Sequence, residues 1–384
     1  MRILQVCPFF APHVGGVETH VEMVSRELAR RGHEVTVLTS AHLKGLPETE
    51  RTPEGILIRR VRSSGTVFRT PLALSTGRVL RGLEPRPEVV HLHYPPPVTS
   101  YLAARALRSS GLPVCLTYHC DLFMDGPLGI ALTAVYDRIF LPTTLNVARR
   151  IVVHAASYAR TSRALQGRAI AVIPSLVDTQ RFHPREDDQE LRRAIGAEGR
   201  SVVLFVGRLV PHKGVEDLLL AVPDLPSDAL LVVAGDGPHR RSLEELARGR
   251  GIESRVRFVG AVSDEDLPRY HAVAAVVALP SQNRLEGFGL AIVEAMASGR
   301  PAVVADLPGV REVIEDGVDG LLSEPLLSED LARKCSSLLN DPERRRMMGR
   351  RARESALAKY QVSVVVDQLE ALYRTMAAKG GVGS

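Results

Sequence analysis

Short apolar runs alternate with helix-spaced apolar positions at the start of the chain. Ile3 to Val6 is an apolar run, and it is followed by a turn at Pro12 to Gly16. Four apolar positions then recur at helical spacing: Val17, Val21, Val24 and Leu28. Gly32 is a typical helix terminator, and His33 to Thr39 forms a second apolar run. The pattern predicts a strand, a right-handed crossover helix and a parallel strand.

The same alternation continues through both halves of the chain. Further runs of strand length lie at residues 89–93, 113–117, 150–153 and 169–173, and then at 201–207, 229–234, 256–259, 275–279 and 301–305. Strands that alternate with helices in this way form parallel sheets covered on both faces. Between the two halves, residues 182–199 contain Pro184 and the charged stretch 185–188, which interrupt the apolar pattern as a linker does.

We therefore expect an α/β protein with two Rossmann-like, doubly wound parallel-sheet domains. The N-terminal domain is predicted to cover residues 1–190 and the C-terminal domain residues 191–359. A last helix, at about 360–384 with Ser363 as a plausible N-cap, is expected to pack back on the first domain. Open parallel sheets bind ligands at the carboxyl ends of their strands, so two such domains are expected to face a central cleft.

Length and composition fit this architecture. The chain has 384 residues, of which 45% are apolar and 24% charged, and this is too long for one ordinary core. No apolar run reaches the ~18 residues of a membrane span, and the N-terminus lacks a signal-peptide pattern, so we expect a cytoplasmic protein. The four cysteines have no paired metal-ligand spacing, which argues against a zinc site or a disulfide framework.

The charge balance narrows the class of partner. A formal charge of +5 suits an acidic partner such as a nucleotide sugar, an anionic membrane or nucleic acid. Aromatic residues make up only 4% of the chain and tryptophan is absent, so base-stacking platforms are poorly supported. We expect no nucleic-acid partner.

The segment 280–299 contains the most informative chemistry. Glycines occur where a predicted strand ends and a helix begins, within the run Gly287, Phe288, Gly289 and Leu290. The backbone N–H groups of the last three would point out of the helix N-terminus and form a site for a diphosphate. Glu294 could accept hydrogen bonds from a ribose diol, and Glu286 could bind sugar hydroxyls. The alternative is that both are solvated surface charges.

Three motifs together resemble a known enzyme family. Glu286 and Glu294 have the spacing of a paired-glutamate motif, Val206 to Gly214 resembles a basic donor motif, and Val232 to Pro238 resembles the strand and turn that follow it. The chain is similar, from Met1 to about Tyr373, to GT-B fold glycosyltransferases of family 4, also called glycosyl transferases group 1. The resemblance implies a retaining enzyme that uses a nucleotide diphosphate sugar.

Arg208 and Lys213 match the cations of the basic donor motif, which neutralise the diphosphate in the family. A leaving nucleoside diphosphate gains negative charge as the glycosidic bond breaks. Two fixed cations would therefore stabilise the transition state more than the ground state. The alternative is that both are ordinary surface charges after a buried strand.

Other donor-site residues follow from the resemblance. Gly15 and Gly16 open the first crossover helix, where the backbone of family members approaches the donor phosphate or the acceptor; an ordinary tight turn is the alternative. His119 ends a predicted strand at the position of a histidine near the reacting sugar, and a core or cleft-lining histidine is the alternative. The backbone around Val262 is expected to hold the base.

Two features suggest a metal site only weakly. His91 and His93 lie on one face of a strand and could share a metal, but no third ligand is obvious. The acidic triplet 264–266 is preceded by Ser263, which indicates a helix cap with acids in the first turn. We expect no metal and no cofactor besides the donor.

The sequence contains fewer indications of how an acceptor would bind. Four arginines are concentrated in the first domain, namely Arg59, Arg60, Arg62 and Arg69. Residues 127–145 carry many apolar side chains. The combination suits peripheral contact with an anionic membrane, and the alternative is a solvated basic face beside a buried helix.

We predict a retaining, metal-independent glycosyltransferase that moves a glucose- or mannose-type hexose from a UDP- or GDP-linked donor. The acceptor would be lipid-linked, a saccharide or a small molecule. The residues assigned to catalysis are His119, Arg208, Lys213 and Glu286. One alternative is a non-catalytic nucleotide-sugar-binding protein. Another is an epimerase or oxidoreductase, although Gly15 and Gly16 do not form the G-x-G-x-x-G fingerprint that such enzymes need.

Overall fold

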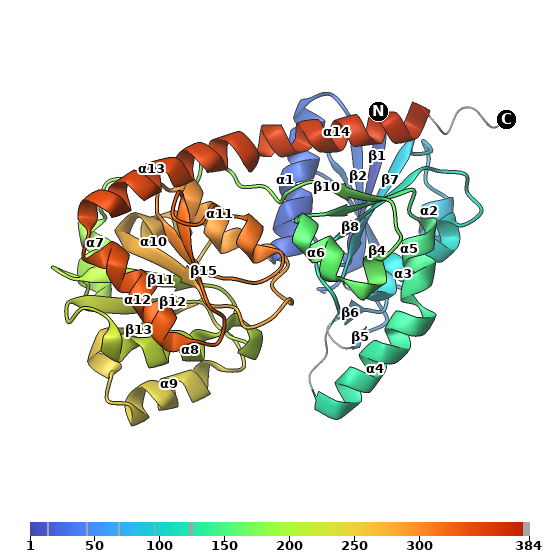
Figure 1. The fold of residues 1–384 in the computed structure, drawn as a ribbon. Coiled ribbons are helices and arrows are strands. Elements are labelled where there is room, and N and C mark those ends of the chain that lie inside the picture. Colours follow the sequence, from blue (N-terminus) through green and yellow to red (C-terminus); the bar gives the residue numbers. More distant parts are fainter. Residues whose placement is uncertain (14, 44, 68–69, 96, 123–125, 379–384) are drawn as a thin grey trace. The chain divides into compact units, whose positions relative to one another are not determined.

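A computed structural model of the chain describes residues 1–13, 15–43, 45–67, 70–95, 97–122 and 126–378. The chain forms two compact units (Figure 1). The first comprises Met1–Ser175 together with Val362–Ser384, and the second comprises Leu176–Gln361. Each unit is built around one sheet, which is mainly parallel in the first unit and entirely parallel in the second.

The part of the first unit that is described contains an eight-stranded sheet. Its strands are β1 (Arg2–Val6), β2 (Glu34–Ala41), β3 (Thr49–Arg51), β4 (Leu57–Arg62), β7 (Val89–Tyr94), β8 (Val114–Tyr118), β9 (Arg150–Val153) and β10 (Ile170–Val172). They lie in the order β10-β9-β8-β7-β1-β2-β4-β3, and every pair is parallel except β3 with β4. A small antiparallel pair consists of β5 (Thr66–Val67) and β6 (Thr70–Pro71).

Helices pack against this sheet. They are α1 (Gly16–Arg30), α2 (Thr76–Arg81), α3 (Pro97–Leu107), α4 (Gly126–Ile139), α5 (Leu141–Val147), α6 (Ala156–Thr161), the 3-10 turn η1 (Arg163–Leu165) and α14 (Val362–Ala378). The last helix, α14, comes from the far end of the sequence and runs beside α1 (Figure 1).

The second unit, all of whose residues are described, has a six-stranded parallel sheet. Its strands are β11 (Ser201–Val206), β12 (Ala229–Ala234), β13 (Val256–Gly260), β14 (Ala274–Leu279), β15 (Ala302–Ala305) and β16 (Gly320–Ser323), in the order β13-β12-β11-β14-β15-β16. Its helices are α7 (Gln189–Ile195), η2 (Pro211–Lys213), α8 (Val215–Ala221), η3 (Val222–Asp224), α9 (Arg240–Gly249), η4 (Glu253–Arg255), α10 (Leu267–Val273), α11 (Leu290–Ala297), η5 (Val310–Glu312), α12 (Ser328–Leu339) and α13 (Pro342–Lys359).

Both sheets reverse the direction of chain progress at their centre. In the first unit the strands run outward from β1 through β2, and then from β7 in the opposite direction. In the second unit they run outward from β11, and then from β14 in the opposite direction. Right-handed crossovers place the helices of the two halves on opposite faces, which explains why every residue of β7 and of β12 is buried. The crevice at each reversal is the expected ligand site of such a sheet.

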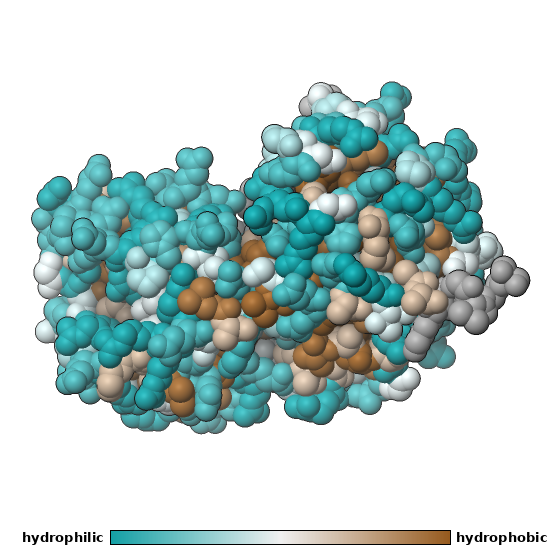
Figure 2. All heavy atoms as spheres, turned by 90° about the horizontal axis from the view of Figure 1, so that it is seen from above, coloured by the Kyte–Doolittle hydropathy of each residue, from teal (hydrophilic) through white to brown (hydrophobic). Residues whose placement is uncertain are grey.

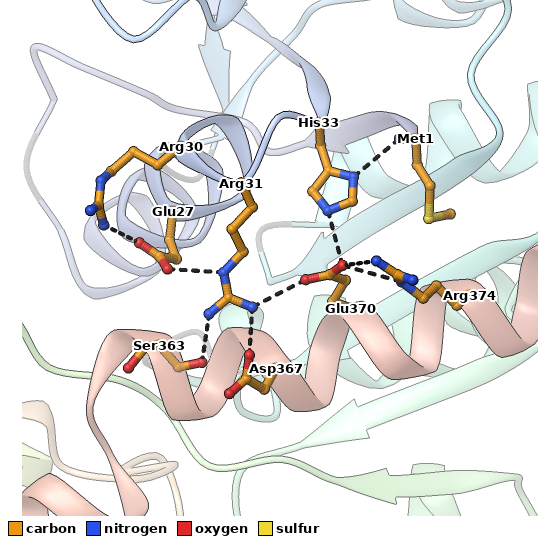
Figure 3. Close-up of polar contacts among 9 residues, drawn as sticks. All are labelled: Met1, Glu27, Arg30, Arg31, His33, Ser363, Asp367, Glu370 and Arg374. Carbon is orange, nitrogen blue, oxygen red and sulfur yellow. Dashed lines mark hydrogen bonds and ion pairs between the residues drawn. The ribbon is translucent and has the colours of Figure 1, made fainter.

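Charged contacts fasten α14 to the first unit (Figure 3). The Arg31 guanidinium donates to Glu370 Oε2 at 3.1 Å, to Asp367 Oδ1 at 2.6 Å and to the Ser363 carbonyl at 3.0 Å. His33 Nε2 lies 3.2 Å from Glu370 Oε1. Because Ser363 lies inside the helix, which begins at Val362, the prediction that Ser363 is the N-cap is wrong. Residues 379–384 of the predicted last helix lie outside the described residues.

The division between the units falls before Leu176 and not at residue 190. Val177 and Phe182 are buried in the core of the second unit. Val177 N–H also donates to the Tyr360 carbonyl at 2.8 Å, within the same unit. The charged stretch that suggested a linker is a surface loop of this unit, and its last residue, Asp188, caps α7 by accepting from Leu191 N–H. Polarity therefore indicated exposure here, not a domain boundary.

Every strand predicted from an apolar run is present, while β3 to β6 and β16 were not predicted. Strand β4 was read as basic surface, but its residue Arg60 is buried and donates to Glu50 Oε2 at 2.7 Å. Arg62 is exposed and donates to Glu48 Oε1 at 2.5 Å, and Arg69 lies outside the described residues. Arg60 and Arg62 are therefore paired with glutamates and are not free basic groups.

The face of the molecule in Figure 2 is mainly hydrophilic, with hydrophobic residues in small groups. Within the described residues, no helix combines the length and apolar character that crossing a bilayer requires. Helix α4 carries four large hydrophobic side chains that are exposed. They are Leu128, Ile130, Val135 and Ile139.

Candidate donor site and histidine cluster

The loops after β11 and β14 meet at the centre of the second sheet. The first loop contains Arg208 and η2, and the second leads from Pro280 to α11. Gln282 links them, because its N–H donates to the His212 carbonyl at 2.8 Å. Its side-chain amide donates to Asp217 Oδ2, on α8, at 2.9 Å. The topology therefore brings together two motifs that lie far apart in the sequence, since parallel strands end at the same edge.

Lys213 and Glu286 form an ion pair at this point. Lys213 Nζ donates to Glu286 Oε2, and the hydroxyl of Ser281 donates to the same oxygen at 3.1 Å. The Glu286 side chain is 9% exposed and that of Lys213 is 19% exposed. The interpretation of Glu286 as a solvated loop charge is therefore wrong, because a buried carboxylate requires partners and has them here.

Arg208 lies in the loop after β11, which also contains Lys213. It is exposed and follows Gly207, at which a Cβ would lie 3.8 Å from Cε of Lys213. The cationic side chains at 208 and 213 thus leave the sheet at the same strand end. The structure leaves the Arg208 guanidinium open to solvent, whereas it holds the Lys213 ammonium against a carboxylate.

The start of α11 lies in the second loop. Gly289 caps the helix with φ 87°, in the left-handed region that favours glycine, and a Cβ there would lie 2.9 Å from Leu279. The N–H of Ile292, the third residue of the helix, donates to the Gly289 carbonyl at 2.9 Å, so an anion at this helix start would meet the amides before it. The Phe288 side chain is buried and packs edge-on against Tyr360 at 5.7 Å, so only the backbone of Phe288 fits the predicted anion site.

Glu294 lies in the second turn of α11, with its side chain 19% exposed. Burial raises the pKa of Glu294 to about 8, and the nearby Arg181 guanidinium opposes this rise. His271 is fully buried, and its Nε2 lies 3.9 Å from Glu294 Oε2. Val262 lines a surface pocket together with Ala261 and Tyr270. The structure does not join Glu294 to this pocket.

In the first unit, Gly15 is the N-cap of α1 and Gly16 is its first residue. Glu18 follows in the first turn and was not singled out from the sequence. Its side chain is buried, and burial raises the pKa of this carboxyl to about 7. A Cβ at position 15 would meet Glu18 Oε2, so the Glu18 carboxyl packs directly against the Gly15 backbone. An acid in the first turn of a helix was the available signal.

His119 belongs to a cluster of five histidines at the carboxyl edge of the first sheet. Its Nε2 lies 3.2 Å from His93 Nδ1, and its Nδ1 lies 3.0 Å from His154 Nε2. The rings of His20 and His119 meet edge-on at 5.1 Å, and those of His91 and His93 lie 4.3 Å apart. Burial lowers the pKa of every one of these rings, to about 4 for His154 and about 3 for His91.

The hypothesis that His91 and His93 share a metal does not fit these contacts. His91 contacts Tyr373 and Thr117, and His93 contacts Gln5 and His119. No group of three or more His, Cys, Asp or Glu side chains in the described part of the chain is arranged to hold a metal ion.

The acidic triplet is structural, but the prediction that it forms the first turn of a helix capped by Ser263 is wrong, because Asp266 is the N-cap of α10 and the first turn contains no acid. Ser263 Oγ accepts from Asp266 N–H at 3.1 Å and donates to Asp266 Oδ2 at 2.8 Å. The helix α10 begins only at Leu267, so the turn at Ser263 precedes the helix.

Comparison with known proteins identifies the family. The model of the family Glycosyltransferase Family 4 matches residues 14–181, and the model of Glycosyl transferases group 1 matches residues 187–355. The GDP-mannose-dependent alpha-mannosyltransferase of Mycolicibacterium smegmatis is 32% identical over 99% of this chain and 98% of its own length. The chain belongs to glycosyltransferase family 4.

Two further similarities support the assignment of the chain to family 4. Alpha-D-kanosaminyltransferase of Streptomyces kanamyceticus is 34% identical over 71% of this chain and 72% of its own length. The crystal structure of Anabaena HepE in complex with UDP and glucose has a TM-score of 0.80, with 22% identity over 98% of this chain and 100% of that chain. The fold is therefore GT-B, and the protein is a glycosyltransferase.

Sequence patterns found only part of the site of this family 4 enzyme. They did not indicate that Lys213 binds Glu286, since the residues are 73 positions apart. They also left out Gln5, His20, His154 and Tyr373, which contact the other members of the histidine cluster. The available signal was that Gln5, His93, His119 and His154 all lie at or just beyond the carboxyl ends of predicted strands.

Proposed function

We propose that this enzyme transfers a glucose- or mannose-type hexose from a UDP- or GDP-linked donor with retention of configuration and without a metal ion. The donor diphosphate would bind to the second unit at Arg208, Lys213 and the first amides of α11. Transfer would go to a lipid-linked, saccharide or small-molecule acceptor, with Gly15, Gly16 and His119 of the first unit near the reacting groups.

The observation that carries the proposal is the meeting of Lys213, Glu286 and the start of α11 at one reversal point of the second sheet. This is where an open α/β sheet binds its ligand. A lysine ammonium and the amides at a helix start are suited to a diphosphate, because both supply hydrogen-bond donors and positive charge. Relatives named for a GDP-mannose donor, and the fold shared with a UDP complex, agree with this donor class.

Each acidic residue receives a different role. Glu286 would bind hydroxyls of the transferred sugar, since Lys213 and Ser281 both donate to the same one of its two oxygens. Glu294 would bind the ribose diol, because a carboxyl group accepts hydrogen bonds from hydroxyls in either protonation state. The backbone around Val262 would hold the base.

Retention would proceed without a carboxylate nucleophile. Glu286 is tied to a lysine, which stabilises its charge and lowers its nucleophilicity. We therefore propose that the leaving diphosphate assists attack by the acceptor from the same face of the sugar. Arg208 and Lys213 would stabilise the charge that develops on that diphosphate.

The proposal is tested by donor screening followed by a transfer assay. UDP, GDP and ADP are compared by thermal shift, because a ligand that binds only the folded state raises the melting temperature. We expect a clear rise with UDP or GDP, and release of that nucleotide from its sugar derivative. Binding without release of nucleotide, in the presence of candidate acceptors, would contradict the proposed transfer and leave a nucleotide-sugar-binding protein.

A further inference from the structure

A continuous series of polar contacts passes through the histidine cluster of the first unit. Starting from β8, Thr117 Oγ1 lies 2.7 Å from His91 Nε2, and His91 Nδ1 lies 2.5 Å from the Tyr373 hydroxyl. That hydroxyl lies 3.5 Å from Gln5 Nε2. Gln5 Oε1 in turn lies 2.9 Å from His93 Nε2.

The series continues to His119 and beyond. His93 Nδ1 faces His119 Nε2 at 3.2 Å, and His119 Nδ1 faces His154 Nε2 at 3.0 Å. His154 Nδ1 lies 3.1 Å from the Ile173 carbonyl oxygen, where the series ends. Thr117, Gln5, His91 and His93 are fully buried, as is Tyr373 of α14. Water is thus excluded from most of the series, and its members must satisfy one another.

The number of hydrogens fixes the direction of these bonds. The Ile173 carbonyl only accepts, so His154 carries its hydrogen on Nδ1, and a neutral His154 then accepts at Nε2. His119 must therefore donate from Nδ1 and accept at Nε2, and His93 must donate from Nδ1 and accept at Nε2. The Gln5 amide then donates to His93, which requires its nitrogen and oxygen to exchange places, because Oε1 now faces His93 and Nε2 faces Tyr373. The oxygen and nitrogen of an amide are assigned from such networks.

With the exchanged orientation every group between Thr117 and Ile173 both donates and accepts one hydrogen. Tyr373 donates to Gln5 Oε1 and accepts from His91 Nδ1–H, and His91 Nε2 accepts from the Thr117 hydroxyl. With the opposite amide orientation, four hydrogen bonds would link two carbonyl oxygens through three neutral imidazoles. Three imidazoles supply only three hydrogens, so one ring would have to be an imidazolium. The low pKa values of all these buried rings favour the neutral arrangement.

We propose that Gln5, His93 and His154 are positioning residues that hold His119 as a neutral imidazole with its hydrogen on Nδ1, in a hydrogen-bond chain running from Thr117 to Ile173. Both ring nitrogens of His119 are then engaged within the first unit. His119 would serve the reaction as a fixed, uncharged contact and not as a general base. This last point rests on the proposed function, whereas the hydrogen-bond chain does not.

The hydrogen-bond chain is tested by NMR of the full-length protein with ¹⁵N-labelled histidine. Two-bond ¹H–¹⁵N correlations report the tautomer of each ring. His119→Gln identifies the His119 signals by their loss. We expect a neutral His119 with hydrogen on Nδ1 in the wild type at pH 7. A His119 with its hydrogen on Nε2, or a charged one, would overturn the proposal directly.

Variants test the role of each neighbour. His154→Phe removes the acceptor, so the His119 signal should change tautomer or become mixed. His154→Gln can donate to Ile173 and accept from His119, so it should restore the wild-type signal.

Gln5→Glu offers only acceptors, so one imidazolium should appear among His93, His119 and His154, whereas Gln180→Glu, at an exposed position, should produce none. If His154→Phe does not fold, the wild type, His154→Gln and Gln5→Glu still decide the matter.

Activity provides a separate readout. His154→Phe should lower kcat by roughly 10-fold to 100-fold with little change in the donor KM, because it misplaces a contact near the reacting atoms. A protein without transferase activity but with the expected tautomers would contradict the proposed function and still support the hydrogen-bond chain. An active enzyme whose His119 signal is the same in wild type, His154→Phe and Gln5→Glu would contradict only the hydrogen-bond chain.

Discussion

The proposed donor-site residues differ in burial, and therefore in how much their substitution affects stability. They are Arg208, Lys213 and Glu286. Arg208 is exposed, so its substitution tests charge with little effect on packing. Lys213 and Glu286 neutralise each other in a largely buried place, so changing either one also changes stability. Loss of activity in these variants therefore needs different controls.

Arg208→Ala is expected to lower kcat/KM by about 100-fold, because on our proposal it removes one of the two cations that would stabilise the leaving diphosphate. The melting temperature should stay close to that of the wild type. Arg241→Ala is the matched control, since Arg241 is in the same unit and its side chain is 91% exposed. Steady-state kinetics with the donor selected by thermal shift provide the measurement. Equal kcat/KM in the two variants would remove Arg208 from the site.

The Lys213 and Glu286 pair is tested by a double-mutant cycle. Lys213→Ala leaves a buried carboxylate with a hydroxyl partner only, so it should cost roughly 2–3 kcal/mol of unfolding free energy. Adding Glu286→Ala should cost less than the sum of the single changes, because no buried charge then remains. Urea unfolding of all four proteins measures the coupling. Additive losses would contradict the ion pair, and an active double variant would contradict the role in catalysis.

Single residues show where sequence reasoning reached its limit. The motif order placed Lys213, Glu286 and Gly289 correctly at strand ends, since apolar periodicity reports the strands directly. Nothing local indicates that Lys213 meets Glu286, or that Tyr373 meets His91, because those contacts depend on the order of strands in the sheet and on where α14 docks. The polarity of Arg60 suggested an exposed side chain, but Arg60 is buried and donates to a glutamate.

At the level of elements, α14 and α4 differ in how they meet the rest of the first unit. The helix α14 is fastened by Arg31 and contributes Tyr373 to the core (Figure 3). The helix α4 leaves four large hydrophobic side chains exposed, with Leu128 at 71% and Ile139 at 59%. The first arrangement stabilises the fold, and the second suits an apolar partner.

The attachment of α14 should weaken in acid. Hydrogen bonds from Arg374 and Arg31 lower the pKa of Glu370 from 4.5 to about 2, against a smaller effect of burial. A carboxyl group whose pKa is lowered by folding stabilises the fold above its unfolded pKa, and this contribution is lost as the pH falls toward the folded pKa. Glu370→Gln should therefore reduce the melting temperature at pH 7, and the difference from wild type should shrink between about pH 4.5 and pH 2. A difference independent of pH would contradict this.

The exposed face of α4 is expected to contact a membrane, in line with the apolar character of residues 127–145. Leu128→Glu combined with Ile139→Glu should abolish cosedimentation with phosphatidylglycerol vesicles, because charged side chains oppose insertion of an apolar face. Leu74→Glu changes a side chain that is 64% exposed elsewhere in the first unit and should leave binding intact. Equal sedimentation of all three proteins, or none for the wild type at low salt, would remove the membrane contact.

For the whole molecule, each unit places its candidate residues at the reversal point of its own sheet. In the first unit these residues lie after β1, within β7 and after β8, and in the second they lie after β11 and β14. The alternation of strands and helices predicted both sheets, and topology explains why the sites lie where they do. The boundary before Leu176 was not predictable from polarity, because the charged loop that follows lies on the surface of the second unit, between residues of its core.

The donor site is tested most directly by a crystal structure of the enzyme with the nucleoside diphosphate that most raises its melting temperature. We expect the β-phosphate within hydrogen-bond distance of the Arg208 guanidinium, Lys213 Nζ and the first backbone amides of α11. A diphosphate bound elsewhere, with none of these groups in contact with it, would contradict the assignment of the donor site.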